Sequence, residues 1–190
     1  MGSKVQNIVL GTLTVCLISL TVIYAVLTQK LDINANANSK SSTWDIHFEN
    51  LNSSVIGKAK LSSDNQLAIM NDSTTISGSV GNLYLPGDSI IYTFDIVNGG
   101  TMPAVLSVSP TIGAPECSSL SMTSSNDVCN NVEYTLTYDD GTDIRTGDSL
   151  DKGEKRAAKL TLSLKETMSS VPSEDVNITN IAATLFYSQK

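Results

Sequence analysis

Residues 1–30 of the chain read as one long apolar segment. No charged residue occurs between Val5 and Gln29, and about 20 helical residues are enough to cross a bilayer core of about 30 Å. Several hydroxyl residues dilute the apolarity and leave a buried core helix as an alternative, but the segment is apolar all round and not on one face. We therefore expect an N-terminal helix that is either a transmembrane anchor or a signal peptide.

The residues around this segment leave its fate open. The small-x-small motif Ala35-Asn36-Ala37 follows the apolar run, as in a signal-peptidase site. The basic residues before and after the run nearly balance, so the charge rule gives only a slight preference for a cytoplasmic N-terminus. Two localisations follow: a cell-membrane anchor with the remaining chain extracellular, or secretion after cleavage near Ala37.

Beyond residue 43, apolar side chains recur at every second position, the period of a strand with one buried face. Four strands are clear, with apolar faces of Trp44, Ile46 and Phe48; of Ile90, Tyr92, Phe94 and Ile96; of Val132, Tyr134, Leu136 and Tyr138; and of Ala158, Leu160, Leu162 and Leu164. A last strand is expected at 181–187. Weaker candidates lie at 55–61, 67–70, 74–80 and 104–108.

Turn signals separate these strands at short intervals: Pro86-Gly87-Asp88, Asn98-Gly99-Gly100, Asp140-Gly141 and Lys152-Gly153. Alternation on one face between such turns is typical of an antiparallel β-sandwich. The prediction is an all-β domain over 44–190, jelly-roll or immunoglobulin-like, with about eight or nine strands. No helical stripe is expected inside it, only one short turn within 166–173. Residues 31–43 are polar and small, and are predicted to be a spacer.

Composition narrows the classes of partner. The net charge is −7 and charged residues make up only 16% of the chain. No Lys/Arg stripe exists to displace phosphate counterions, so nucleic acid is not an expected partner. The acidic balance also disfavours electrostatic binding to an anionic bilayer surface. Contact with a membrane is therefore expected only through the N-terminal helix.

The three cysteines divide by location. Cys16 lies in the apolar segment, where a thiol behaves as a small apolar group. Cys117 and Cys129 lie in a polar, turn-rich stretch, and a disulfide between them would stabilise the domain by about 3 kcal/mol. We expect this disulfide if the domain is exported, because such pairs persist in oxidising compartments. Two unpaired thiols are the alternative.

Candidate catalytic and metal-binding chemistry is sparse. His47 is the only histidine, lies between Asp45 and Glu49 on an outward strand face, and is expected to be solvated. No Gly-x-Ser-x-Gly elbow or His-Glu-x-x-His motif is present. Asp139-Asp140-Gly141-Thr142-Asp143 resembles a fragment of a calcium loop, but a hairpin turn around Asp-Gly explains it better. The sequence predicts no enzyme, no cofactor and no metal site.

Three features carry a resemblance: the N-terminal apolar segment, Trp-Asp-Ile-His-Phe at 44–48, and Leu-Pro-Gly-Asp-Ser at 85–89 leading into Tyr-Thr-Phe-Asp-Ile-Val-Asn-Gly-Gly at 92–100. This arrangement resembles the camelysin/TasA group of exported surface and biofilm-matrix proteins of Gram-positive bacteria. The resemblance implies a jelly-roll-like sandwich and, for matrix members, fibres built by strand donation. Two departures are the late small-x-small motif and the lack of zinc ligands for the protease activity that the camelysin name suggests.

The expected function is therefore that of a non-enzymatic cell-surface or extracellular-matrix structural protein. It would act through contacts with other protein subunits, including self-association into a fibre, with residues 31–43, once freed by cleavage, as the natural donor strand. The alternative is a membrane-anchored binding module. In that case the loops at 113–129 or 139–147 would bind a carbohydrate, a cation or a receptor.

Overall fold

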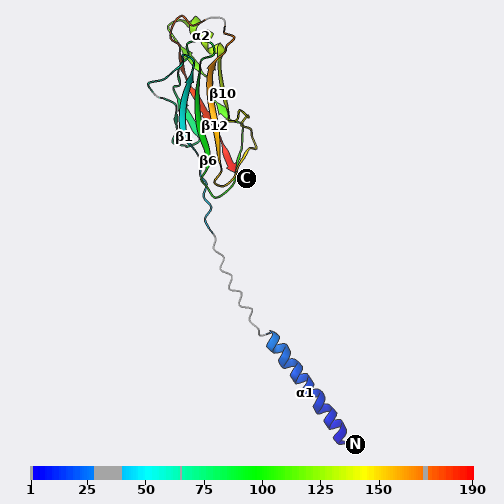
Figure 1. The fold of residues 1–190 in the computed structure, drawn as a ribbon. Coiled ribbons are helices and arrows are strands. Elements are labelled where there is room, and N and C mark those ends of the chain that lie inside the picture. The colour runs from blue at the N-terminus through cyan, green and yellow to red at the C-terminus, as the bar shows by residue number, and fades with distance from the viewer. Residues whose placement is uncertain (1, 28–39, 65, 169–170) are drawn as a thin grey trace. The chain divides into compact units, whose positions relative to one another are not determined.

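The computed structural model describes residues 2–27, 40–64, 66–168 and 171–190. They belong to two compact units, one ending at Lys40 and one comprising Ser41–Lys190. The first unit contains helix α1 (Gly2–Leu27), and the second contains all described strands and a short helix (Figure 1). Most of the predicted spacer, residues 31–43, lies outside the described residues.

Helix α1 confirms the predicted N-terminal apolar helix. It is long and apolar enough to cross a membrane over Gly2–Thr21, and none of that window is buried. The side chains of Val9, Leu13 and Leu17 are all more than half exposed, so α1 is not part of a protein core. The same properties fit a membrane anchor and a secretory signal.

The hydroxyl residues of α1 explain how it remains compatible with lipid. The hydroxyls of Thr14, Ser19 and Thr21 donate hydrogen bonds to carbonyl oxygens one turn earlier, at 2.7–2.9 Å. A hydroxyl whose donor is satisfied inside its own helix does not require water or a neighbouring helix. The polarity of these residues is therefore only weak evidence against a membrane-spanning helix.

The largest sheet of the second unit contains the four strands that the alternation predicts. Its order is β1 (Ile46–Ile56), β6 (Ser89–Asn98), β12 (Lys155–Leu164) and β10 (Val132–Tyr138), with every pair antiparallel (Figure 1). One detail of the prediction is wrong. Trp44 precedes β1 and is 44% exposed, whereas Ile46 and Phe48 are buried as expected.

Three smaller antiparallel sheets complete the described strands. One has the spatial order β3 (Ala68–Ile69), β4 (Thr75–Gly78), β14 (Ile181–Thr184) and β8 (Thr111–Ile112). The second has the order β2 (Lys60–Leu61), β5 (Gly81–Asn82), β13 (Asn177–Thr179) and β9 (Glu116–Ser118). The third has the order β11 (Ser149–Leu150), β7 (Ala104–Leu106) and β15 (Tyr187–Gln189). The predicted total of eight or nine strands is therefore too low. The strand expected at 181–187 is split into β14 and β15, and several strands contain only two residues.

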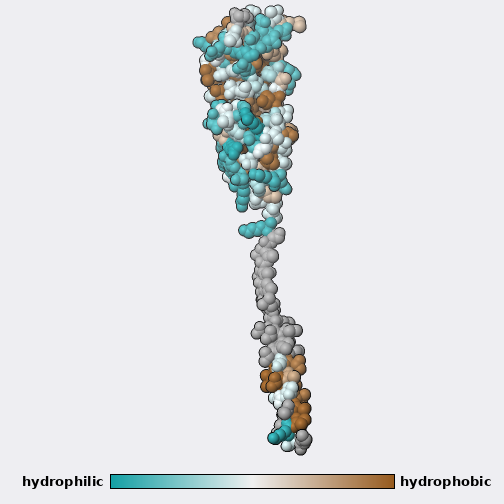
Figure 2. All heavy atoms as spheres, turned by 90° about the vertical axis from the view of Figure 1, so that its right-hand side faces the viewer, coloured by the Kyte–Doolittle hydropathy of each residue, from teal (hydrophilic) through white to brown (hydrophobic). Residues whose placement is uncertain are grey.

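The inward faces of these sheets share one hydrophobic core. From the large sheet come Phe94, Leu160 and Leu162, and from the sheet around β14 come Ile76 and Ile181, each at most 2% exposed. The rings of Phe48 and Phe94 lie 4.8 Å apart between centroids, a separation typical of favourable aromatic pairs. On the face seen in Figure 2, hydrophilic and intermediate side chains surround scattered apolar ones.

Asp88, in the predicted turn before β6, organises the surrounding backbone. It is 2% exposed, and its carboxylate accepts hydrogen bonds of 2.8 Å from the backbone N–H groups of Lys58, Tyr84 and Leu85. Three backbone donors on one carboxylate are a strong arrangement, because bonds to a charged acceptor are stronger than neutral ones. Asp88 thereby ties the chain after β1 to the entry of β6.

Asn98 has the same role at the other end of β6. It is 1% exposed; its amide donates to the carbonyls of Met102 and Leu150, and its side-chain oxygen accepts from the N–H of Gly100. Gly100 itself is constrained, since a Cβ there would lie 2.6 Å from the carbonyl oxygen of Thr43. In the Asn-Gly-Gly turn, Asn98 and Gly100 are buried, and the bonds of Asn98 join the turn to Met102 and Leu150.

The structure corrects the expectation of no helix in the domain. Helix α2 (Met122–Asn131) begins after the N-cap Ser121, whose side chain accepts a bond from the N–H of Ser124. Val128 anchors it in the core at 1% exposure. A Ser N-cap is a recognisable start signal, but the helix lacks an apolar stripe that would reveal it. The expected short turn is present at Glu166–Thr167.

Candidate functional site

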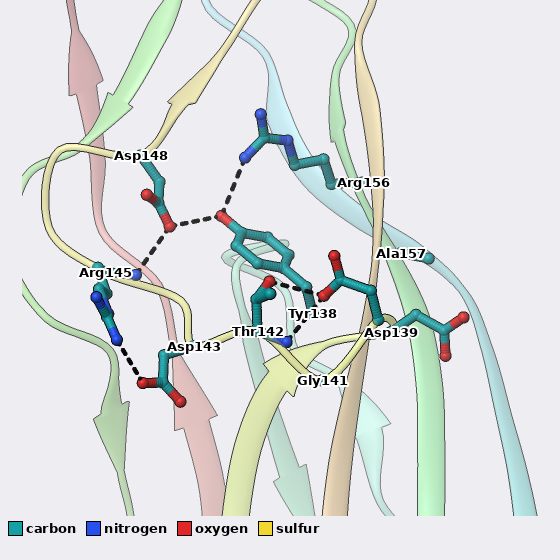
Figure 3. Close-up of a pocket in the computed structure, with 10 residues that line it drawn as sticks. Tyr138, Asp139, Gly141, Thr142, Asp143, Arg145, Asp148, Arg156 and Ala157 are labelled. Atoms are coloured by element: carbon teal, nitrogen blue, oxygen red, sulfur yellow. Dashed lines mark hydrogen bonds and ion pairs between the residues drawn. The ribbon is translucent and has the colours of Figure 1, made fainter.

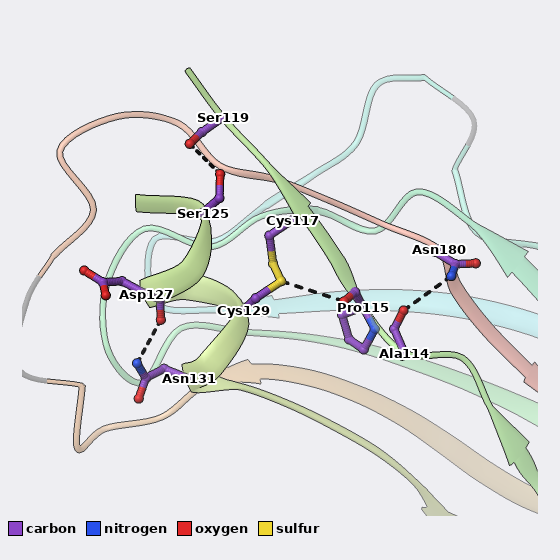
Figure 4. Close-up of a disulfide and its surroundings, with 9 residues drawn as sticks. All are labelled: Ala114, Pro115, Cys117, Ser119, Ser125, Asp127, Cys129, Asn131 and Asn180. Atoms are coloured by element: carbon purple, nitrogen blue, oxygen red, sulfur yellow. Dashed lines mark hydrogen bonds between the residues drawn. A yellow bond between two sulfur atoms is a disulfide. The ribbon is translucent and has the colours of Figure 1, made fainter. Parts of the chain in front are cut away.

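The predicted disulfide between Cys117 and Cys129 is present in the structure. It joins β9 to α2, with the two Cα atoms 5.8 Å apart (Figure 4). The loop at 113–129 that the sequence offered as a binding loop is therefore mostly a strand and a helix. The hydroxyls of Ser119 and Ser125 are hydrogen-bonded to each other beside the disulfide. The disulfide and this hydrogen bond hold the segment together, so it is not an open loop.

The Asp139–Asp143 segment is the hairpin turn that the sequence favours. Tyr138 donates its N–H to the carbonyl of Thr142, and Gly141 adopts a φ of +87°, which only glycine accommodates readily. The carboxylate of Asp140 accepts bonds from the N–H and the hydroxyl of Thr142. Within the described residues, no group of three or more His, Cys, Asp and Glu side chains is placed to hold a metal ion.

This turn borders an open, mostly polar hollow of about 940 Å³, which we call the hairpin hollow. It is lined by Tyr138, Asp139, Asp140, Gly141, Thr142, Asp143, Arg145, Asp148, Arg156 and Ala157 (Figure 3). The register of β10 and β12 pairs Tyr138 with Ala158, which places Arg156 beside the tyrosine. The sequence argument found the turn but missed the Tyr138, Asp148 and Arg156 group.

The polar groups of the hairpin hollow are bonded to one another. The Tyr138 hydroxyl donates to Asp148 at 2.9 Å, and the same Asp148 oxygen accepts from the N–H of Arg145 at 2.8 Å. The guanidinium of Arg156 lies over the Tyr138 ring, 5.3 Å from its centroid. Arg145 forms an ion pair of 2.9 Å with Asp143. Burial, followed by the bond to Asp148, raises the pKa of Tyr138, which therefore stays protonated as a donor.

A second hollow of about 300 Å³, the edge hollow, lies where the start of β1 meets the β14–β15 junction. It is lined by Trp44, Asp45, Ile46, Asp72, Ser73, Thr74, Leu185, Phe186 and Tyr187. Trp44 and Phe186 are both exposed, at 44% and 51%. Two exposed aromatic side chains therefore lie at one hollow.

Two strand edges that no described strand pairs with border the edge hollow: the outer edge of β1 and the edge of β15 away from β7. Phe48 donates its N–H to the carbonyl of Ser73, on the side of β1 away from β6. Backbone groups of a strand point the same way at every second residue, so the N–H and C=O of Ile46 also point away from β6. The carbonyl of Phe186 accepts a hydrogen bond from the N–H of Ser107, next to β7. The backbone N–H and C=O of the following residue, Tyr187, therefore point away from β7. Both strands thus offer backbone groups to this hollow.

His47 lies on the outer face of β1, as predicted, but it is not simply solvated. Its Nδ1 lies 2.8 Å from Asp45, and its Nε2 lies 3.8 Å from Glu49. Glu49 also pairs with Lys155 of the same sheet. One polar row therefore links Asp45, His47, Glu49 and Lys155.

Comparisons of the chain with protein-family models, with curated proteins and with solved structures find no match. The resemblance to the camelysin/TasA group therefore stays a prediction.

Proposed function

We propose that residues 44–190 form a two-layer, jelly-roll-like sandwich that acts outside the cell as a structural protein of a surface or matrix. The shared core of the large sheet and the sheet around β14 supports the two layers. The Cys117–Cys129 disulfide favours an oxidising compartment. Helix α1 provides a means of export or anchoring. The protein works by binding other protein subunits and not by catalysis.

The observation that carries this proposal is the edge hollow with its two unpaired strand edges. An extended segment placed there would hydrogen-bond to Ile46 on one side and to Tyr187 on the other, and would cover the exposed Trp44 and Phe186. Completion of a sheet by an incoming strand is a common mode of protein recognition. The geometry supports a strand-accepting subunit better than a loop-based receptor.

The chain itself supplies a segment of the right pattern. Residues 31–38 read Leu-Asp-Ile-Asn-Ala-Asn-Ala-Asn, in strict alternation of apolar and polar positions. This period places every apolar side chain of a strand on one face. The segment lies outside the described residues, and its sequence alone makes it the candidate donor. We propose that residues 31–38 of one copy fill the edge hollow of the next, which yields a fibre.

Substitution of Ile33 tests this donor. Ile33→Asp introduces a charge on the apolar face of the donor and should abolish concentration-dependent assembly of the full chain, as measured by light scattering. Asn34→Asp adds the same charge on the opposite face and should leave assembly unchanged. Phe186→Ala in the acceptor should weaken assembly as well. Equal assembly of both donor variants would eliminate strand donation by this segment.

The fate of α1 has a separate test. The intact mass of the chain is measured from membranes and from the medium of an expressing Gram-positive host. A full-length mass confined to membranes indicates an anchored subunit. A released chain that begins after Ala37 lacks most of the alternating segment, and would then require a different donor.

The hairpin hollow favours a second candidate function, that of a carbohydrate-binding module. Three of its four carboxylates are already engaged, Asp140 by Thr142, Asp143 by Arg145 and Asp148 by Tyr138, which disfavours a cation. Paired carboxylate, guanidinium and hydroxyl groups suit the hydroxyls of a sugar. Calorimetric titration with cell-wall oligosaccharides should show binding that Arg156→Ala removes. An increase in melting temperature with calcium would instead support a cation.

A further inference from the structure

The second half of β1 is an exposed sheet edge. β1 is the outermost strand of the order β1-β6-β12-β10 (Figure 1), and no described strand pairs with its other side. Residues 52–56 are all exposed, including Val55 at 45% and Ile56 at 52%. Two exposed β-branched side chains at the end of an unpaired edge are the features of a strand that accepts another strand.

The backbone of this half-strand points its hydrogen-bonding groups outward at alternate residues. The register shifts between Glu49 and Asn52, where Asn50 has a φ of 57°. Beyond this bulge Asn52 pairs with Thr93.

The direction of each group follows from the neighbouring ladder. Asn98 donates its N–H to Glu154 of the β12 side, so the even-numbered residues of β6 face β12 and the odd-numbered residues face β1. Ser54, opposite Ile91, therefore bonds to β6. Ser53 and Val55 on either side of it direct their N–H and C=O groups away from the sheet.

Beyond its bulge, this edge lacks the charged and proline residues that usually prevent pairing. Natural edge strands carry lysines, prolines or inward-pointing charges that prevent association. Residues 51–57 read Leu-Asn-Ser-Ser-Val-Ile-Gly, without a charge or a proline. In a chain of net charge −7, this stretch allows two copies to approach without direct repulsion between like charges.

We propose that β1 is a homotypic interface, in which it pairs antiparallel with β1 of a second copy about a two-fold axis at Ser54. Ser53 of each copy then exchanges backbone hydrogen bonds with Val55 of the other, about four bonds in all. The two four-stranded sheets become one continuous sheet. In a contact about a two-fold axis, the same surface of both copies meets. A second copy of this chain therefore fits the β1 edge without any other partner being assumed.

This interface deepens the proposed structural function but does not use the edge hollow. Strand donation produces a head-to-tail chain of subunits, whereas β1 pairing joins two subunits side by side in opposite directions. Ser41, at the start of each domain, then lies at opposite ends of the pair. The arrangement suits copies on facing surfaces or copies in a matrix, and would cross-link fibres laterally.

Charge placed on the edge tests the pairing in the full chain in detergent. Val55→Lys should weaken self-association at least tenfold in analytical ultracentrifugation. Val108→Lys, at a site of similar exposure (48%) outside β1, should leave it unchanged. Ile33→Asp in the background of both variants removes strand donation from the measurement. Equal association of the two lysine variants overturns the interface.

A cross-link makes the test independent of any folding defect in Val55→Lys. In a Cys16→Ser background, Ser54→Cys places two thiols across the axis, with Cα atoms about 4.5 Å apart and within disulfide range. Under mild oxidation, this variant should form covalent dimers at least ten times faster than exposed Ser109→Cys. Equal rates overturn the proposal.

Discussion

Replacement of Asp88 by asparagine is the sharpest test of how this domain is held together. The carboxylate receives three backbone N–H bonds, one oxygen from Lys58 and the other from Tyr84 and Leu85. Asparagine has one acceptor oxygen, and its NH₂ group must face at least one of these donors. Since Asp88 is 2% exposed, water cannot readily replace the lost acceptor.

The magnitude follows from the bonds. A hydrogen bond to a charged group contributes about 1.5–3 kcal/mol, and an unsatisfied buried donor costs about 1–3 kcal/mol. We therefore expect Asp88→Asn to lower the free energy of unfolding by about 2–4 kcal/mol at neutral pH. Urea titration of the full chain followed by intrinsic fluorescence measures this value. Asp175→Asn, which makes the same change at an exposed aspartate, should shift it by less than about 0.5 kcal/mol.

The pH dependence gives this prediction a second signature. Burial alone would raise the pKa of Asp88, but the backbone N–H donors of Lys58, Leu85 and Tyr84 outweigh it and hold the pKa below its ordinary value of 3.8. Because the folded-state pKa is the lower one, the contribution to stability is complete above about pH 4 and is lost as the pH falls through the folded-state pKa. The difference between the parent chain and Asp88→Asn should therefore shrink below pH 4. A difference under about 0.5 kcal/mol at neutral pH would refute the reasoning.

Three further changes have defined outcomes. Joint substitution of Cys117 and Cys129 by serine should lower the free energy of unfolding by about 3 kcal/mol in urea, since the loop they close has a sequence separation of 12. Gly57→Ala should lower the melting temperature, because a Cβ would lie 2.2 Å from the Asp88 carboxylate at a φ of +77°, and its effect should not add to that of Asp88→Asn. Phe94→Ala should cost about 3–5 kcal/mol in the same urea assay, with an unchanged far-ultraviolet spectrum in the absence of denaturant as its control.

The parts of the fold that the sequence predicted are those with a long, regular period. In β12, Leu160, Leu162 and Leu164 alternate over enough residues for the pattern to stand above chance, and all three are buried. The same holds for β6. Helix α1 was evident for a related reason, since a run without charge has few other structural explanations.

The parts that the sequence did not predict are held in place by distant residues. A two-residue strand such as β11 contains no period, and it exists because Leu150 pairs opposite Ala104. Helix α2 has low intrinsic helix propensity, and its position depends on the disulfide and on Val128. Neither constraint is local, so neither appears in a window of neighbouring positions.

The two hollows were beyond sequence reasoning for the same reason. The turn at Asp140-Gly141 was predicted from its own residues, but Arg156 reaches Tyr138 only through the register of β10 and β12. Trp44 was expected on the buried face of a strand. Its exposure beside Phe186 follows from the pairing of β15 with β7, which the spacing of apolar residues does not encode.

Two of the motifs that carry the family resemblance, Pro-Gly-Asp and Asn-Gly-Gly, have structural roles in this chain, and this determines where function should be tested. Asp88 of Pro-Gly-Asp binds three backbone groups, and Asn98 of Asn-Gly-Gly joins the carbonyls of Met102 and Leu150. Neither side chain lines the hairpin hollow or the edge hollow. A protein can keep these residues to form the same turns at the two ends of β6 and still have a different activity. Evidence for a matrix role must therefore come from the edge hollow and the β1 edge, since variants of Asp88 and Asn98 would report stability alone.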